Sequence, residues 1–166
     1  MFEHAKPTGV LSRQLLAGLK RGFALDWDGI HGVRHWGRVR RNGLTIATTN
    51  AANRRVVELF AVFHDAARWD DGGDPLHGER GAELAVEMQG RFFTLADDEL
   101  ALLVAACCGH TGGRSPRNVT VQTCWDADRL DLGRIWIRPS PLYLSTEFAQ
   151  RPAVIDWAFK RSREAP

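Results

Sequence analysis

Apolar residues recur at every third or fourth position along much of the chain, and polar residues fill the positions between them. The pattern is clearest in residues 10–19, 56–63, 82–88 and 95–106. This spacing places apolar side chains on one face of a helix, whereas a half-buried strand needs alternation, which no stretch sustains. The pattern therefore predicts an all-α protein.

Glycine, proline and aspartate gather between these stretches and predict where helices end. The clusters lie at residues 70–75, 109–116 and 139–141. About seven helices fit a chain of this length, and we expect one helical-bundle domain over residues 1–166. The first helix is expected from about residue 8 to residue 23, with Thr8 as its N-cap.

Composition excludes several classes of protein. The chain has 22 Lys and Arg against 20 Asp and Glu, and a net charge of +2 does not indicate a nucleic-acid partner. No stretch resembles a signal peptide or a membrane span. The cysteines (Cys107, Cys108 and Cys124) lack the spacing of a zinc motif. We therefore expect a cytoplasmic protein with reduced thiols and with neither a nucleic-acid nor a membrane partner.

The pair His64 and Asp65 directly follows the apolar stretch 56–63. Ionisable side chains on a helix built for the interior need partners. Side chains at neighbouring helix positions diverge by about 100°, so the imidazole and the carboxylate can bind a cation from two sides. The alternative is structural: an aspartate that caps a helix and a core histidine bonded to a carbonyl.

Histidines and carboxylates also gather elsewhere. His31 and His35 share one helical face, but Gly32 stands where a zinc protease needs glutamate, which excludes that mechanism. Further along, more carboxylates stand together than helix solubility requires: Asp126, Asp128 and Asp131.

In order and character, three elements resemble the His…His-Asp…Asp signature of the HD superfamily of metal-dependent phosphohydrolases: His35, the doublet His64-Asp65, and the stretch Ala127-Asp128-Arg129-Leu130. The resemblance covers about residues 30–132. It implies an all-α HD-type bundle whose core binds a divalent metal through His35, His64, Asp65 and Asp128. Asp128 is chosen over Asp126 because the family's last aspartate commonly follows alanine, as in Ala-Asp-x-Leu. Asp126 and Asp131 would then support the ligands or form salt bridges, and His31 would lie outside the ligand set.

Some HD proteins hold two metals with the help of additional histidines, and His77 and His110 occupy suitable places in this chain. Thr111 takes the place of a second histidine that often follows. The resemblance leaves two roles open for His77 and His110: ligands of a second metal, or groups that contact substrate or transfer protons.

Several arginines follow these histidines at helical spacing and are candidates for binding phosphate oxygens. Arg38 follows His35 by three positions, and Arg68 follows His64 by four. Arg80 and Arg114 are further candidates.

The resemblance implies a phosphohydrolase, acting as a phosphomonoesterase or phosphodiesterase on a nucleotide or another small phosphate ester. Metal-activated water would be the nucleophile, Asp65 would bind metal and orient the water, and Arg38 and Arg68 would hold phosphate oxygens. One or two ions of Mn, Fe, Co, Ni, Zn or Mg suit such ligands. The alternatives are a di-iron oxygenase of the HD type, with His35, His64, Asp65, His77, His110 and Asp128 as ligands, and a non-catalytic nucleotide-binding module. Substrate, metal identity and oligomeric state stay open.

Overall fold

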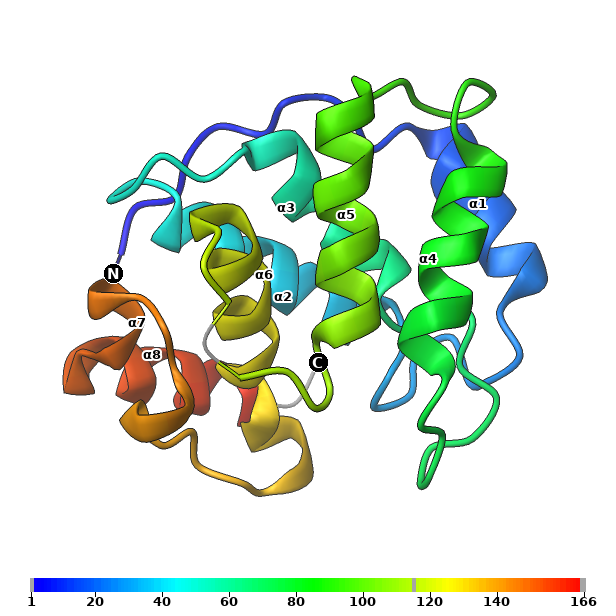
Figure 1. The fold of residues 1–166 in the computed structure, drawn as a ribbon. Coiled ribbons are helices and arrows are strands. Elements are labelled where there is room, and N and C mark those ends of the chain that lie inside the picture. Colours follow the sequence, from blue (N-terminus) through cyan, green and yellow to red (C-terminus); the bar gives the residue numbers. More distant parts are fainter. Residues whose placement is uncertain (1, 115, 165–166) are drawn as a thin grey trace.

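The computed structural model describes residues 2–114 and 116–164, and in them it contains eight α-helices, two short 3₁₀-helices and no strand (Figure 1). The all-α prediction is confirmed. In chain order the elements are α1 (Arg13–Gly22), α2 (Val33–Ile46), α3 (Arg54–Phe63), α4 (His77–Met88), α5 (Asp97–Gly109), α6 (Val119–Arg129), η1 (Leu132–Ile135), η2 (Pro141–Tyr143), α7 (Glu147–Gln150) and α8 (Pro152–Arg163).

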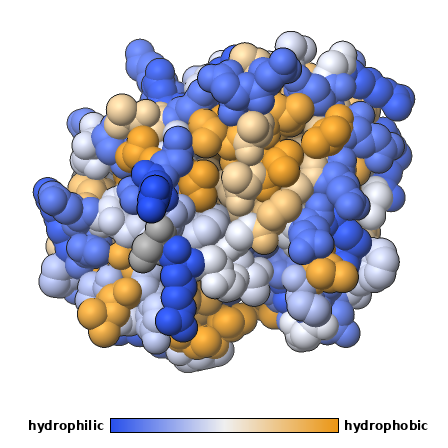
Figure 2. Space-filling model, viewed as in Figure 1, coloured by the Kyte–Doolittle hydropathy of each residue, from blue (hydrophilic) through white to orange (hydrophobic). Residues whose placement is uncertain are grey.

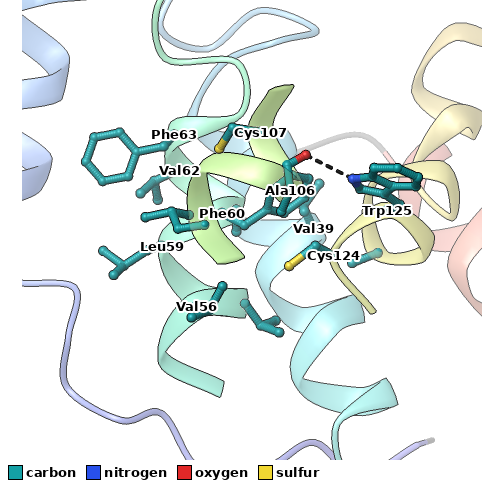
Figure 3. Close-up of a cluster of buried hydrophobic side chains, with 14 of the residues drawn as sticks. Val39, Val56, Leu59, Phe60, Val62, Phe63, Ala106, Cys107, Cys124 and Trp125 are labelled. Carbon is teal, nitrogen blue, oxygen red and sulfur yellow. Dashed lines mark hydrogen bonds between the residues drawn. The ribbon is translucent and has the colours of Figure 1, made fainter. Parts of the chain in front are cut away.

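Helix α3 lies at the centre of the bundle and packs against α2, α4, α5 and α6. Every residue from Val56 to Phe63 is buried, which explains why all of them except Glu58 are apolar. Figure 3 shows these side chains meeting Val39 of α2, Ala106 and Cys107 of α5, and residues of α6. The indole Nε1 of Trp125 donates to the carbonyl of Ala106 at 2.9 Å, so α5 and α6 are also joined by a buried hydrogen bond.

Close backbone approach fixes α4 against α3. A Cβ atom on Gly81 would lie 2.2 Å from the carbonyl oxygen of Phe63, so only glycine fits at this position. The contact holds the beginning of α4 near the end of α3. It therefore brings His77, the first residue of α4, close to His64 and Asp65.

The prediction for the first helix was wrong at its beginning. Helix α1 begins at Arg13, and Ser12 is its N-cap, with its hydroxyl accepting from the amide of Leu15. The amide of Thr8 instead donates to Oε2 of Glu58 at 2.8 Å, and its hydroxyl donates to the same oxygen at 2.5 Å. Glu58 is fully buried and also pairs with Arg40. A buried carboxylate is costly without such donors, so it draws Thr8 away from the helix.

Helices α7 and α8 lie at the opposite end of the bundle from α1 and α4 (Figure 1). The face drawn in Figure 2 is mostly hydrophilic, with apolar atoms gathered over α4 and α5. Within the described ranges, no helix combines the length and the apolar character needed to cross a membrane.

Candidate metal centre

Four histidines and two aspartates from five helices meet at one place in the core. His35 lies in the first turn of α2, and His64 caps the end of α3, with Asp65 next to it. His77 begins α4, His110 caps the end of α5, and Asp128 lies in the last turn of α6. Their ligand atoms form two groups, each within 4.8 Å: His35, His64 and Asp128 in the first, and Asp65, His77 and His110 in the second.

In the first group, the Nε2 atoms of His35 and His64 lie 2.9 Å apart. Oδ1 of Asp128 lies 3.4 Å from Nε2 of His35 and 3.8 Å from Nε2 of His64. This oxygen is buried and has no hydrogen-bond partner among the described residues. An unpartnered buried carboxylate oxygen indicates a missing cation or donor at this point.

The second group repeats this arrangement. The Nε2 atoms of His77 and His110 are 2.9 Å apart. Oδ1 of Asp65 lies 3.2 Å from Nε2 of His77 and 4.0 Å from Nε2 of His110. Two imidazoles and one carboxylate oxygen are again the donors.

Asp65 connects the two groups. Its other oxygen, Oδ2, lies 3.5 Å from Nε2 of His35 and also 3.5 Å from Nε2 of His64. Each carboxylate oxygen therefore faces a different histidine pair. Asp65 would therefore be able to supply one oxygen to a metal ion at each group.

The hydrogen bonds at Nδ1 decide which ring nitrogen of each histidine is free. Nδ1 of His35 faces Oδ2 of Asp131 at 2.7 Å, and Nδ1 of His64 faces the carbonyl of Phe60 at 3.1 Å. Nδ1 of His110 faces the carbonyl of Cys107 at 2.7 Å, and Nδ1 of His77 faces that of Asp74. Since all these partners only accept, each Nδ1 donates its proton. Every neutral ring then presents the lone pair of Nε2, as metal-bound histidines do.

The Nε2 lone pairs of His35 and His64 lie 2.9 Å apart and would repel each other unless a positive charge lay between them. In the absence of metal, a proton on His35 supplies that charge. Burial and the charge of Arg134 oppose protonation of His35, but the carboxylates of Asp128, Asp131 and Asp65 outweigh them and raise its pKa to about 9. Burial lowers the pKa of His64 to about 3. Without metal, one proton therefore lies on His35 and is shared toward His64, in the place where a metal cation fits.

The carboxylates of both groups stay ionised. Burial opposes ionisation of Asp65, but the charges of His64 and His35 hold its pKa well below the usual range. Burial likewise opposes ionisation of Asp128, and the same two histidines lower its pKa. This buried negative charge, together with the converging Nε2 atoms, fits divalent metal ions.

The arginines predicted to bind phosphate have protein partners. Nε of Arg38 donates to Oδ1 of Asp131 at 2.7 Å. Arg68 donates to the carbonyls of Asp70 and Gly72 at 2.8 and 2.9 Å, and its NH1 lies 3.4 Å from Asp65 Oδ1 and 3.1 Å from Nε2 of His77. Arg38 thus holds Asp131, and Arg68 holds Asp65 and the loop that follows α3.

The other candidates lie at different distances from the centre. Arg80 pairs with Asp74 and stacks on the ring of Trp69 at 3.9 Å, so it also supports the loop before α4. Arg114 is exposed at the rim of the cavity above the centre. His31 lies outside both groups, with its Nδ1 2.8 Å from Asp71 Oδ1.

The structure separates the three clustered acids. Asp128 faces the histidines, whereas Asp126 accepts from the amides of Ser145 and Thr146 at 2.8 and 2.7 Å and so holds the beginning of α7. Asp131 contacts the Nδ1 side of the His35 ring and accepts a hydrogen bond from Nδ1. The geometry therefore brings Asp128 into the group of ligand atoms and leaves Asp126 outside it.

Four of the six side chains of the two groups border a cavity of about 1320 Å³. Asp65, His77, His110 and Asp128 face into it. One wall is formed by residues of the loop after α5, and another by residues 132–144, which follow α6. The centre is therefore open to a ligand of substantial size.

Sequence reasoning missed Arg134, which also lines this cavity. Its guanidinium NH1 lies 3.8 Å from Asp128 Oδ1, and its side chain is only 9% exposed. Helical spacing could not reveal it, because α6 ends at Arg129 and Arg134 belongs to a separate element, η1. The only signal in the sequence is an arginine shortly after the acidic cluster.

Comparison with solved structures identifies a similar protein. The crystal structure of a "predicted HD superfamily hydrolase" from an uncultured Thermotogales bacterium matches with a TM-score of 0.68 and 25% sequence identity, over 89% of this chain and 84% of that one. No family model matches the sequence, and no curated protein matches it either. The match, together with the two histidine-aspartate groups, confirms the resemblance drawn from the sequence: the chain has the fold of an HD domain, and its clustered ligands fit that domain.

Proposed function

We propose that this HD-domain protein is a metal-dependent phosphohydrolase that acts on a nucleotide or another small phosphate ester. The observation that carries the proposal is the position of Asp65, whose two oxygens face separate histidine pairs at the border of an open cavity. The similar Thermotogales protein, a predicted hydrolase, supports hydrolysis as the class of reaction.

The donor atoms support two metal ions. The first would be held by His35, His64 and Asp128, and the second by His77 and His110, with Asp65 between them. Imidazole nitrogen and carboxylate oxygen accept Mn, Fe, Co, Ni, Zn or Mg. The pairing of His77 with His110 favours a ligand role for both over a role in substrate contact or proton transfer.

Bound metal would lower the pKa of a water molecule and offset negative charge on the phosphate. Asp65 would accept a hydrogen bond from that water and orient it, since its side chain lines the cavity. Asp131 fixes the ring of His35, and Arg38 in turn holds Asp131. Arg68 holds Asp65 and the loop after it. We therefore assign Arg38 and Arg68 to positioning of the ligands.

Metal content and phosphate release test this proposal. Protein purified without chelator and without nickel is analysed by plasma mass spectrometry, and phosphate release is measured on phosphomonoesters and phosphodiesters with each candidate metal. We expect about two equivalents of metal in the native protein. Asp65→Asn should lose metal and activity, whereas His4→Ala, a change at an exposed histidine, should alter neither. Absence of metal after reconstitution, or absence of phosphate release with every metal, would refute the proposal.

A di-iron oxygenase is the second candidate, because all six ligands that it needs lie at this centre: His35, His64, Asp65, His77, His110 and Asp128. About two equivalents of iron with substrate-dependent oxygen consumption, and no phosphate release, would favour it. Tight binding of a nucleotide without turnover would favour a binding module instead.

A further inference from the structure

We infer that residues 132–144 form a recognition wall for a phosphate ester whose alcohol part is bulky and mainly apolar. Arg134 would contact the phosphate, and the apolar side chains of the wall would contact the alcohol part. The inference rests on the proposed function, because it places the phosphate of the substrate at the metal centre.

Arg134 brings a positive charge to the cavity beside the metal centre. Its NH1 donates to the carbonyl of Asp131 at 3.3 Å, but its Nε is buried without a partner in the described part of the chain. A guanidinium has five N–H donors, and a buried one without an acceptor is costly. The side chain lines the cavity beside Asp128. A phosphate oxygen at the centre would lie beside this guanidinium, which would offset its negative charge.

Beyond Arg134 the same wall becomes apolar. Ile137, Leu142 and Tyr143 line the cavity and are 51%, 89% and 66% exposed. Apolar side chains gathered at the mouth of a polar site indicate a binding surface. In Figure 2, apolar atoms lie along the lower edge of the molecule, where this segment runs in Figure 1. Since this surface and the metal centre share one cavity, one ligand can reach both.

The wall is fixed in place by α8. Trp136 ends η1 with a φ of +67°, a conformation that usually requires glycine, and its ring lies 3.8 Å from the guanidinium carbon of Arg163. Trp136 thereby packs toward α8, while Ile135 and Ile137 on either side of it line the cavity. Arg138 pairs with Asp156 of α8. The apolar surface is therefore presented in one defined orientation.

The loop after α5 forms another wall of the cavity. Its lining residues include glycines and the basic side chains of Arg114 and Arg117, so this wall adds positive charge for the phosphate end of a ligand. Arg129 donates to the carbonyls of Tyr143 and Gly113 at 2.8 and 2.6 Å, so its charge joins the two walls. If a ligand were charged at both ends, the apolar side chains of Ile137 and Leu142 would contact either water or a charged group. A single phosphate with an apolar alcohol part matches both regions.

Binding of two phosphonates by the metal-loaded protein tests the inference. Ethylphosphonate and hexylphosphonate carry the same head group, cannot be hydrolysed at the P–C bond, and differ only in apolar length. They are titrated calorimetrically in the presence of Mn²⁺. Each buried methylene contributes about 0.8 kcal/mol, so partial burial of the longer chain should lower Kd at least about ten-fold.

Two variants assign that preference to the wall. Leu142→Ser should reduce the preference for hexylphosphonate several-fold and leave ethylphosphonate unchanged. Val86→Ser is the matched control, because Val86 is an equally apolar residue, 51% exposed, on α4 and away from the cavity. Arg134→Gln should weaken both ligands by the same factor, about ten-fold. Arg134→Lys should restore part of this loss.

Several outcomes would overturn the inference: equal affinity for both phosphonates, no binding of either, the same effect from Leu142→Ser and Val86→Ser, or no effect of Arg134→Gln. Failure of the proposed function gives a different result. A preference for hexylphosphonate that depends on Leu142, in a protein that releases no phosphate from any ester, would uphold the wall and refute the hydrolase.

Discussion

Asp131 accepts the Nδ1 proton of His35 at 2.7 Å, across 96 positions of sequence. This contact leaves Nε2 of His35 as the atom that faces His64 and Asp65. It also gives the ring a carboxylate partner, which increases the basicity of a histidine ligand. Asp131 therefore acts on the centre through His35, without facing the cavity itself.

The first prediction concerns this contact. Asp131→Asn should weaken metal binding about 10–100-fold, because the amide still accepts from Nδ1 but no longer supplies charge. Metal titration of the chelator-treated protein measures the effect. Asp156→Asn, which changes an exposed carboxylate paired with Arg138, is the control and should leave metal affinity unchanged. If the native protein and both variants bound metal with equal affinity, Asp131 would have no role in metal binding.

The second prediction separates two neighbouring acids of α6. Asp126→Asn should lower the free energy of unfolding by about 1–3 kcal/mol, because an amide cannot accept from the amides of both Ser145 and Thr146 as the carboxylate does. It should leave metal stoichiometry intact. Asp128→Asn should do the reverse: it should lose metal from the first group and change the stability of the metal-free protein less. Chemical denaturation and metal analysis of both variants decide the assignment, and loss of metal in Asp126→Asn alone would contradict it.

The ligand groups were accessible to sequence reasoning because each stands at a helix end with a recognisable local pattern. His64 and Asp65 follow an apolar helix, and His77 begins another. Their order resembles the signature of the HD superfamily, and that resemblance is what grouped them. The resemblance also favoured Asp128 over Asp126, and in the structure Asp128 lies beside His35 and His64.

The partners of the arginines were not accessible in the same way. Helical spacing correctly placed Arg38 on the face of His35, but Arg38 meets Asp131, which is 93 positions away. Arg134 lies across a helix boundary, where no regular spacing applies. Thr8 was read as a cap because a buried Glu58 that needs donors cannot be recognised from local sequence. Long-range polar pairing is the information that a periodic pattern does not contain.

The third prediction concerns the close approach of α3 and α4. Gly81→Ala should destabilise the protein by about 1–3 kcal/mol, since its Cβ would meet the carbonyl of Phe63 and push the two helices apart. Gly37→Ala, in α2, meets nothing within 4 Å and should stabilise it by about 0.5–1 kcal/mol. Thermal or chemical denaturation measures both changes. If Gly81→Ala were as stable as Gly37→Ala, the helix contact would not constrain the fold.

The last prediction concerns the pH dependence of the metal-free protein. The pKa of His35 is about 9 in the folded protein, and an unfolded histidine titrates near 6.5. Because the folded pKa is raised, the stabilisation from protonated His35 is complete below about pH 6.5 and is lost as the pH rises through about 9. The free energy of unfolding should fall by up to about 3 kcal/mol over this range.

Metal should remove this dependence, since a cation bound at Nε2 takes the place of the proton. Denaturation curves of the chelator-treated protein between pH 6.5 and 9, with and without added metal, measure the difference. His35→Gln, which keeps a polar side chain but does not titrate, should flatten the metal-free curve. If the free energy of unfolding of His35→Gln declined equally with pH, other groups would cause the pH dependence. The proton shared between His35 and His64 would then be contradicted.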